Sequence, residues 1–123
     1  MRYVLCSRRV SLVAGLIFWF GLSQLAWAHA ILMESTPQQH STVKGPDVSI
    51  VLRYNVRVDG SRSRFVLLGE DGSSRTLTLE KQTSPDVLKS QATGLQAGRY
   101  KLQWRVLASD GHISTGDVAF NVN

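Results

Sequence analysis

Hydrophobic and polar residues alternate one by one in several short runs of this chain. The clearest run spans residues 100–107, where apolar side chains alternate with charged or amide side chains. Residues 48–54 repeat this pattern. A period of two residues is typical of a β-strand with one buried face. On this basis we predict strands at residues 30–34, 48–54, 64–68, 76–79, 87–91, 100–107 and 118–122.

These strands predict an all-β fold. No stretch of ten residues after residue 28 has a helical period, and turn-forming residues such as 70–73 separate the strands. About seven strands in one small domain favour an immunoglobulin-like Greek-key β-sandwich. Residues 95–100 support this fold because they resemble its tyrosine corner. The predicted core contains Ile50, Leu52, Leu67, Leu77, Trp104, Val106, Phe120 and Val122, and Met33 is also assigned to core packing.

The start of the chain has a different pattern. Arginines precede an uncharged run over residues 10–22, and Ala26-Trp27-Ala28 offers the small residues that a signal peptidase recognises. The run is short for a transmembrane helix, which needs about 20 apolar residues. We therefore predict a cleaved signal peptide at residues 1–28 and one exported domain at residues 29–123. Cleavage after Ala30 also fits, but the earlier position lies closer to the apolar run.

Removal of this segment changes the charge and the cysteine content. Arg2, Arg8 and Arg9 are three of the 14 basic residues, and all nine acidic residues follow residue 28, so the net charge falls from +5 to +2. That value does not indicate a nucleic-acid or anionic-membrane partner. The only cysteine, Cys6, leaves as well, which excludes a disulfide and a thiolate ligand from the domain. We expect a soluble, monomeric periplasmic protein that does not insert into the membrane.

Cleavage after Ala28 would make His29 the first residue of the exported chain. Its free amine and its imidazole can then bind one metal ion in a six-membered chelate ring. Asp110-Gly111-His112, near the other end, offers a second imidazole and a carboxylate. Such nitrogen and oxygen donors suit Cu(II) in tetragonal geometry. The first strand and the last loop can meet at one end of a Greek-key sandwich, so His29, Asp110 and His112 are the predicted metal site.

The roles of the other polar residues are less specific. Asp110 can ligate the ion, bind a ligand imidazole from the outer shell, or only shape the turn. His40 lies in a polar loop without acidic or histidine neighbours, and we predict that it is solvent-exposed. After residue 28 the chain has one methionine and no cysteine, so no soft Cu(I) site is expected. The arginines at positions 53, 57, 62 and 64 are interpreted as a solvated face, with a docking patch as the alternative.

Several of these segments resemble the CopC family of copper-resistance proteins. They are His29-Ala30, Ser35-Thr36-Pro37, and the stretch from Trp104 through Ser109-Asp110-Gly111-His112 to Gly116 and Phe120. The resemblance spans residues 29–123 and implies a periplasmic β-sandwich that carries Cu(II) on His29, Asp110 and His112. It also implies a CopD-type membrane partner. Many relatives carry a further glutamate where this chain has Tyr54-Asn55-Val56, so that extra carboxylate is absent here.

These observations predict a copper-binding protein for sequestration, trafficking and resistance, and not an enzyme. One Cu(II) ion per exported chain is expected, with delivery to a CopD-type inner-membrane transporter as a further expectation. Two alternatives remain open at this point. One is a metal-independent interaction module, and the other is a copper monooxygenase, since a histidine at a mature N-terminus also serves enzymes of that class.

Overall fold

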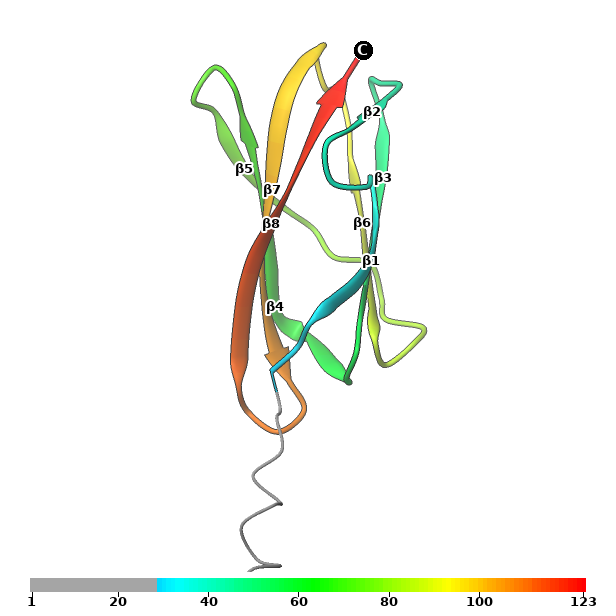
Figure 1. Ribbon diagram of the computed structural model, residues 1–123, viewed down its shortest axis with the longest axis vertical. Helices are drawn as coiled ribbons and strands as arrows, with labels where there is room; N and C mark the ends of the chain where they lie inside the picture. Colours follow the sequence, from blue (N-terminus) through cyan, green and yellow to red (C-terminus); the bar gives the residue numbers. More distant parts are fainter. Residues whose placement is uncertain (1–28) are drawn as a thin grey trace, which may run out of the picture.

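The computed structural model describes residues 29–123, which form two β-sheets packed face to face (Figure 1). The predicted signal peptide lies outside the described residues. One sheet has the strand order β1-β3-β6 and the other β2-β8-β7-β4-β5. Within residues 29–123 there is no helix, and hence none that could cross a bilayer. The strands are β1 (Leu32–Thr36), β2 (Ser41–Val43), β3 (Val48–Tyr54), β4 (Val58–Gly69), β5 (Ser74–Leu77), β6 (Val87–Ala92), β7 (Gly98–Ala108) and β8 (Ile113–Val122).

The facing sides of the two sheets enclose the hydrophobic core. Alternate residues of β3 and β7 are buried, as their apolar–polar patterns predicted. The hydroxyl of Tyr100 donates a hydrogen bond to the carbonyl oxygen of Gln96 (2.8 Å), which confirms the tyrosine corner. The immunoglobulin-like sandwich is therefore confirmed. All eight predicted core residues are buried: Ile50, Leu52, Leu67, Leu77, Trp104, Val106, Phe120 and Val122.

The structure has one strand more than predicted, and several strands have different bounds. The additional strand is β2, which pairs in parallel with β8. β4 begins at Val58, six positions before the predicted start at Arg64. β8 begins at Ile113 and pairs along its length with β7. The connection between these two strands, which the predicted strands 100–107 and 118–122 leave long, is consequently reduced to residues 109–112.

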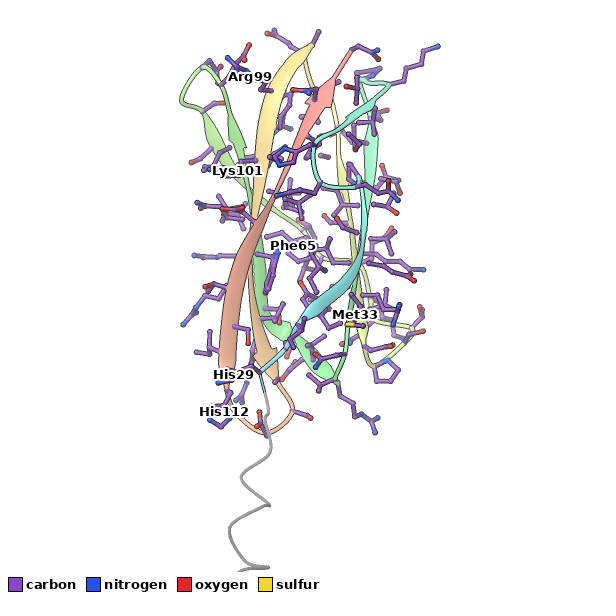
Figure 2. All side chains as sticks on the ribbon, in the orientation of Figure 1. His29, Met33, Phe65, Arg99, Lys101 and His112 are labelled. Atoms are coloured by element: carbon purple, nitrogen blue, oxygen red, sulfur yellow. The ribbon has the colours of Figure 1, made fainter. Side chains whose placement is uncertain are left out.

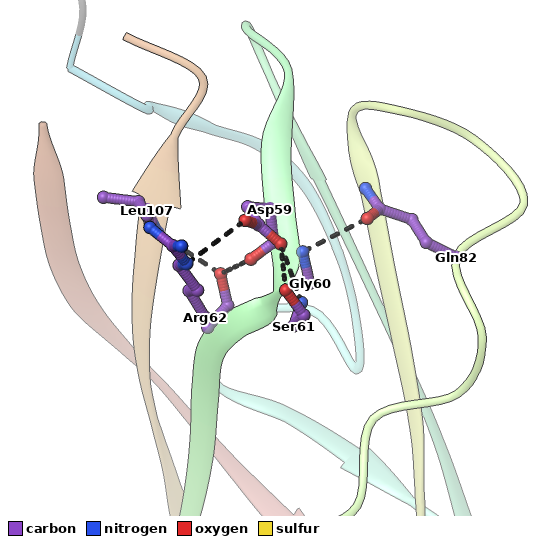
Figure 3. Close-up of polar contacts among 7 residues, drawn as sticks. Asp59, Gly60, Ser61, Arg62, Gln82 and Leu107 are labelled. Atoms are coloured by element: carbon purple, nitrogen blue, oxygen red, sulfur yellow. Dashed lines mark hydrogen bonds and ion pairs between the residues drawn. The ribbon is translucent and has the colours of Figure 1, made fainter. Parts of the chain in front are cut away.

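An irregularity in β4 explains why its first part was missed. The pairing of β4 with β7 shifts register between Asp59 and Arg64. The Asp59 carboxylate accepts hydrogen bonds from the backbone N–H and the hydroxyl of Ser61, and the Gln82 side chain accepts one from the Gly60 N–H (Figure 3). Side chains thus satisfy backbone groups that a regular ladder would pair.

Met33 does not belong to the core, and this prediction was wrong. Its side chain is 54% exposed. β1 shifts register against β3 between Leu32, which pairs with Tyr54, and Glu34, which pairs with Arg53. Met33 is the extra residue of this irregularity, and the pleat no longer directs it toward the opposite sheet.

Candidate metal centre

The loop that carries Asp110 and His112 is a tight hairpin connection at one end of the sandwich. The backbone N–H of Gly111 donates to the carbonyl oxygen of Ala108 (2.9 Å), and the N–H of Ala108 donates to that of His112 (2.8 Å). Gly111 has φ +93°, in the left-handed region that favours glycine. The paired strands β7 and β8 therefore hold His112 at a defined position directly before β8.

The segment that carries His29 is fixed to the same end by two hydrogen bonds. The backbone N–H of Ala30 donates to Oγ of Ser114 on β8 (3.0 Å), and the N–H of Ile31 donates to Oδ1 of Asn55 (2.7 Å). Ala30 itself is buried in the core. Sequence reasoning assigned no positioning role to Ser114 or Asn55, since neither lies in a motif and each bond depends on how the strands meet in space.

The two histidine rings lie close together at this end of the molecule, in an edge-to-face arrangement. The centroids of the His29 and His112 rings lie 5.4 Å apart, with an angle of 61° between the ring planes. Figure 2 shows both side chains beside the β7–β8 connection. Both residues are exposed, so an ion can reach them from solvent. Residues far apart in the chain thus present two imidazoles to the same small volume.

Asp110 contacts His112 twice. Its Oδ1 accepts the backbone N–H of His112 (3.1 Å), and its Oδ2 lies 2.8 Å from Nδ1 of the ring. The first of these bonds, and then the contact with the ring, lower the pKa of the Asp110 carboxyl despite some desolvation. An ionised carboxylate can only accept, so Nδ1 donates to it and Nε2 is left free for another ligand. This is the carboxylate–histidine arrangement that orients many metal-binding imidazoles.

The side chains of residues 29–123 do not by themselves form a complete metal-binding group. No cluster of three or more His, Cys, Asp or Glu side chains in this range is arranged to hold an ion. The predicted site obtains a further nitrogen from the amine of His29, which becomes available only when the preceding peptide bond is cut. His40 is exposed, as predicted, and its backbone N–H bonds to Ala119 near the other end of β8.

Comparison with known proteins gives concordant results. The CopC domain family matches residues 32–123. Copper resistance protein C of Pseudomonas syringae pv. tomato is 30% identical over 108 residues, which cover 82% of this chain and 86% of the relative. Its Escherichia coli namesake is 29% identical over 119 residues, covering 90% of this chain and 93% of the relative.

Two solved structures resemble the fold closely. The crystal structure of CopC from Methylosinus trichosporium OB3b superimposes with a TM-score of 0.72 at 29% identity, covering 77% of this chain and 94% of that chain. PcoC from Escherichia coli is described as a methionine-rich copper resistance protein. It superimposes with a TM-score of 0.63 at 27% identity, and the match covers 78% of this chain and 100% of PcoC. The methionine richness of PcoC has no counterpart in this chain, which has two methionines in all.

Proposed function

This chain belongs to the CopC family, and we propose that it is a periplasmic copper-binding protein that holds one Cu(II) ion per exported chain. The proposed site consists of His29, Asp110 and His112. The observation that carries the proposal is the 5.4 Å approach of the His29 and His112 rings. Neither ring is needed to fill the core, because both are exposed.

The proposed chemistry follows from the donor atoms. His29 chelates the ion through its amine and one ring nitrogen, and His112 binds through Nε2. Asp110 completes the site from the outer shell by holding Nδ1 of His112 (2.8 Å), which is one of the roles that the sequence left open. Nitrogen donors with water in the remaining positions suit Cu(II).

The proposal requires that export leaves His29 at the front of the chain. Burial of Ala30 favours cleavage after Ala28 over cleavage after Ala30. The side chain of Ala30 is only 5% exposed, and its N–H is bonded to Ser114. Cleavage after Ala30 would remove a packed residue and this hydrogen bond together. The intact mass of the exported protein identifies the first residue directly.

We further propose that the protein buffers periplasmic copper and passes it to a CopD-type membrane transporter, without acting as an enzyme. An exposed site supports such transfer, because a partner's ligands can reach the ion while the first set still holds it. The CopD-type partner rests on family membership alone.

Copper titration of three alanine variants tests the site. His29→Ala and His112→Ala should each abolish stoichiometric Cu(II) binding, whereas His40→Ala removes an exposed histidine elsewhere and should bind copper like the unmodified protein. Thermal unfolding of each metal-free variant establishes that it is folded. Full binding in both site variants would refute the proposed ligands, whereas the absence of stoichiometric Cu(II) binding by the unmodified protein would favour the metal-independent interaction module.

A further inference from the structure

A second candidate site lies on the outer face of the five-stranded sheet and does not depend on the copper centre. A depression of about 400 Å³ opens there across β4, β7 and β8. The strand register arranges its outward side chains in two rows. One row runs Arg64, Arg105, Thr115 and the next runs Val66, Gln103, Asp117.

Arg64 and Arg105 are directly opposite each other on adjacent antiparallel strands. Both are exposed, and within residues 29–123 neither forms an ion pair with a carboxylate. Like charges in this position repel each other and destabilise the sheet. The pair is therefore a local concentration of positive charge without a directly paired carboxylate among the described residues.

The other arginines that the sequence grouped with Arg64, at positions 53, 57 and 62, do not line this depression. Arg53 pairs with Glu34 at 2.9 Å on the opposite sheet, and Arg62 lies 3.9 Å from Asp59. The basic patch suggested by sequence spacing is thus not a single surface. Cross-strand pairing instead joins Arg64 to Arg105. Lys101 lies on the same face of β7, four positions before Arg105 (Figure 2).

We propose that the Arg64–Arg105–Thr115 row binds a phosphate group. Two guanidinium groups match the charge of a phosphate monoester, which carries about −1.5 to −2 at neutral pH, and their planar forks suit its oxygens. The Thr115 hydroxyl and the Gln103 amide are additional donors at the same depression. Asp117 lies diagonally across the depression from Arg64. Repulsion between its carboxylate and the phosphate directs the phosphate toward Arg64 and Arg105.

The phosphate can belong to a soluble compound or to a lipid headgroup, and two probes separate these sources. The first probe is inorganic phosphate, followed by NMR of the side-chain Nε–H groups of Arg64 and Arg105 in metal-free protein at constant ionic strength. The second is sedimentation with phosphatidylcholine vesicles that contain or lack phosphatidic acid. The protein is used in the processed form that its host cell produces.

We expect saturable binding of at least one probe that weakens roughly tenfold in Arg64→Gln and in Arg105→Gln, as the loss of a charge-assisted bond implies. Asp117→Asn should strengthen binding because it removes the repulsive carboxylate. Arg62→Gln is the matched control, since it removes one arginine charge from the same strand outside the depression, and it should bind normally. Binding of phosphate alone indicates a soluble ligand, and binding of the acidic vesicles alone indicates a lipid.

Two results would overturn the proposal. One is the absence of saturable binding with both probes. The other is an equal loss in Arg62→Gln, which would show that only net charge matters. A thermal measurement separates ligand binding from a structural role: phosphate should raise the Tm of the unmodified protein but not of Arg64→Gln, while Arg64→Gln without phosphate should be at least as stable as the unmodified protein.

Discussion

The indole ring of Trp104 lies against the backbone of Gly116, its direct partner on the neighbouring strand. The two residues pair in the β7–β8 register, and a Cβ atom at position 116 would overlap the six-membered ring of Trp104. Trp104 is buried and meets Tyr54 edge to face, with 5.3 Å between the ring centroids. Gly116 therefore provides the space in which the largest core side chain fits between the sheets.

This contact predicts that Gly116→Ala destabilises the protein. The added methyl group must displace a buried indole, and overpacking of this kind costs about 1–3 kcal/mol. Chemical denaturation measures the loss as a shift of the unfolding midpoint. Thr115→Ala, on the exposed side of the same strand, is the control and should change stability by no more than about 0.5 kcal/mol. Equal stability of Gly116→Ala and the unmodified protein would show that Trp104 can move aside at no cost.

Tyr54 gives a prediction about stability and pH. Its side chain is 1% exposed, and its hydroxyl has no hydrogen-bond partner among the described residues. Burial raises the pKa of this hydroxyl far above its ordinary value of 10.0. The unfolded chain can then ionise above about pH 10 while the folded chain cannot, so stability is complete below that pH and falls above it by about 1.4 kcal/mol per pH unit.

Tyr54→Phe should remove both effects. The variant should be as stable as the unmodified protein at neutral pH or up to about 1 kcal/mol more stable, because an unpaired buried hydroxyl is lost. It should also lose less stability between pH 10 and pH 11, because this range begins at the ordinary pKa of tyrosine and lies below the raised pKa of Tyr54. Urea unfolding at pH 7, 10 and 11 measures both quantities. A marked loss at pH 7 would mean that the hydroxyl is hydrogen-bonded after all.

Asp110 is predicted to act on copper through His112. Asp110→Asn keeps an acceptor for Nδ1 but removes the negative charge, so Cu(II) affinity should fall about 10–100-fold without being abolished. Asp71→Asn is a suitable control, because Asp71 also accepts a backbone N–H two residues later, from Ser73 (3.0 Å), in a different hairpin loop. Complete loss of binding in Asp110→Asn would instead identify the carboxylate as a direct ligand.

Copper affinity should also depend on pH. Protons compete with the metal for imidazole and amine nitrogens, whose ordinary pKa values are about 6.5 and about 7.7–8.0. The binding constant should therefore fall as the pH drops below about 6. Isothermal titration with Cu(II) at several pH values provides the measurement. A constant affinity between pH 5 and pH 8 would exclude histidine and amine ligands.

Much of the fold could be predicted because its signals are local. Alternation of apolar and polar residues in β3 and β7 needs no information beyond neighbouring positions, and the buried faces follow from it. The first part of β4 and the exposure of Met33 could not be predicted in this way. Both depend on register shifts between paired strands, and a register is a relationship between segments that are distant in the chain.

The candidate site also combines features that the sequence predicts with features that depend on the fold. The sequence by itself determined the chemistry: an imidazole directly after a predicted cleavage position, and an Asp-Gly-His segment whose glycine allows a tight turn. Only the tertiary structure decided that His29 meets His112, through Ala30 bonded to Ser114 across 84 positions of the chain. The Arg64–Arg105 pair likewise exists only in the folded sheet. Donor atoms are properties of single residues, whereas their proximity results from hydrogen bonds and packing between distant strands.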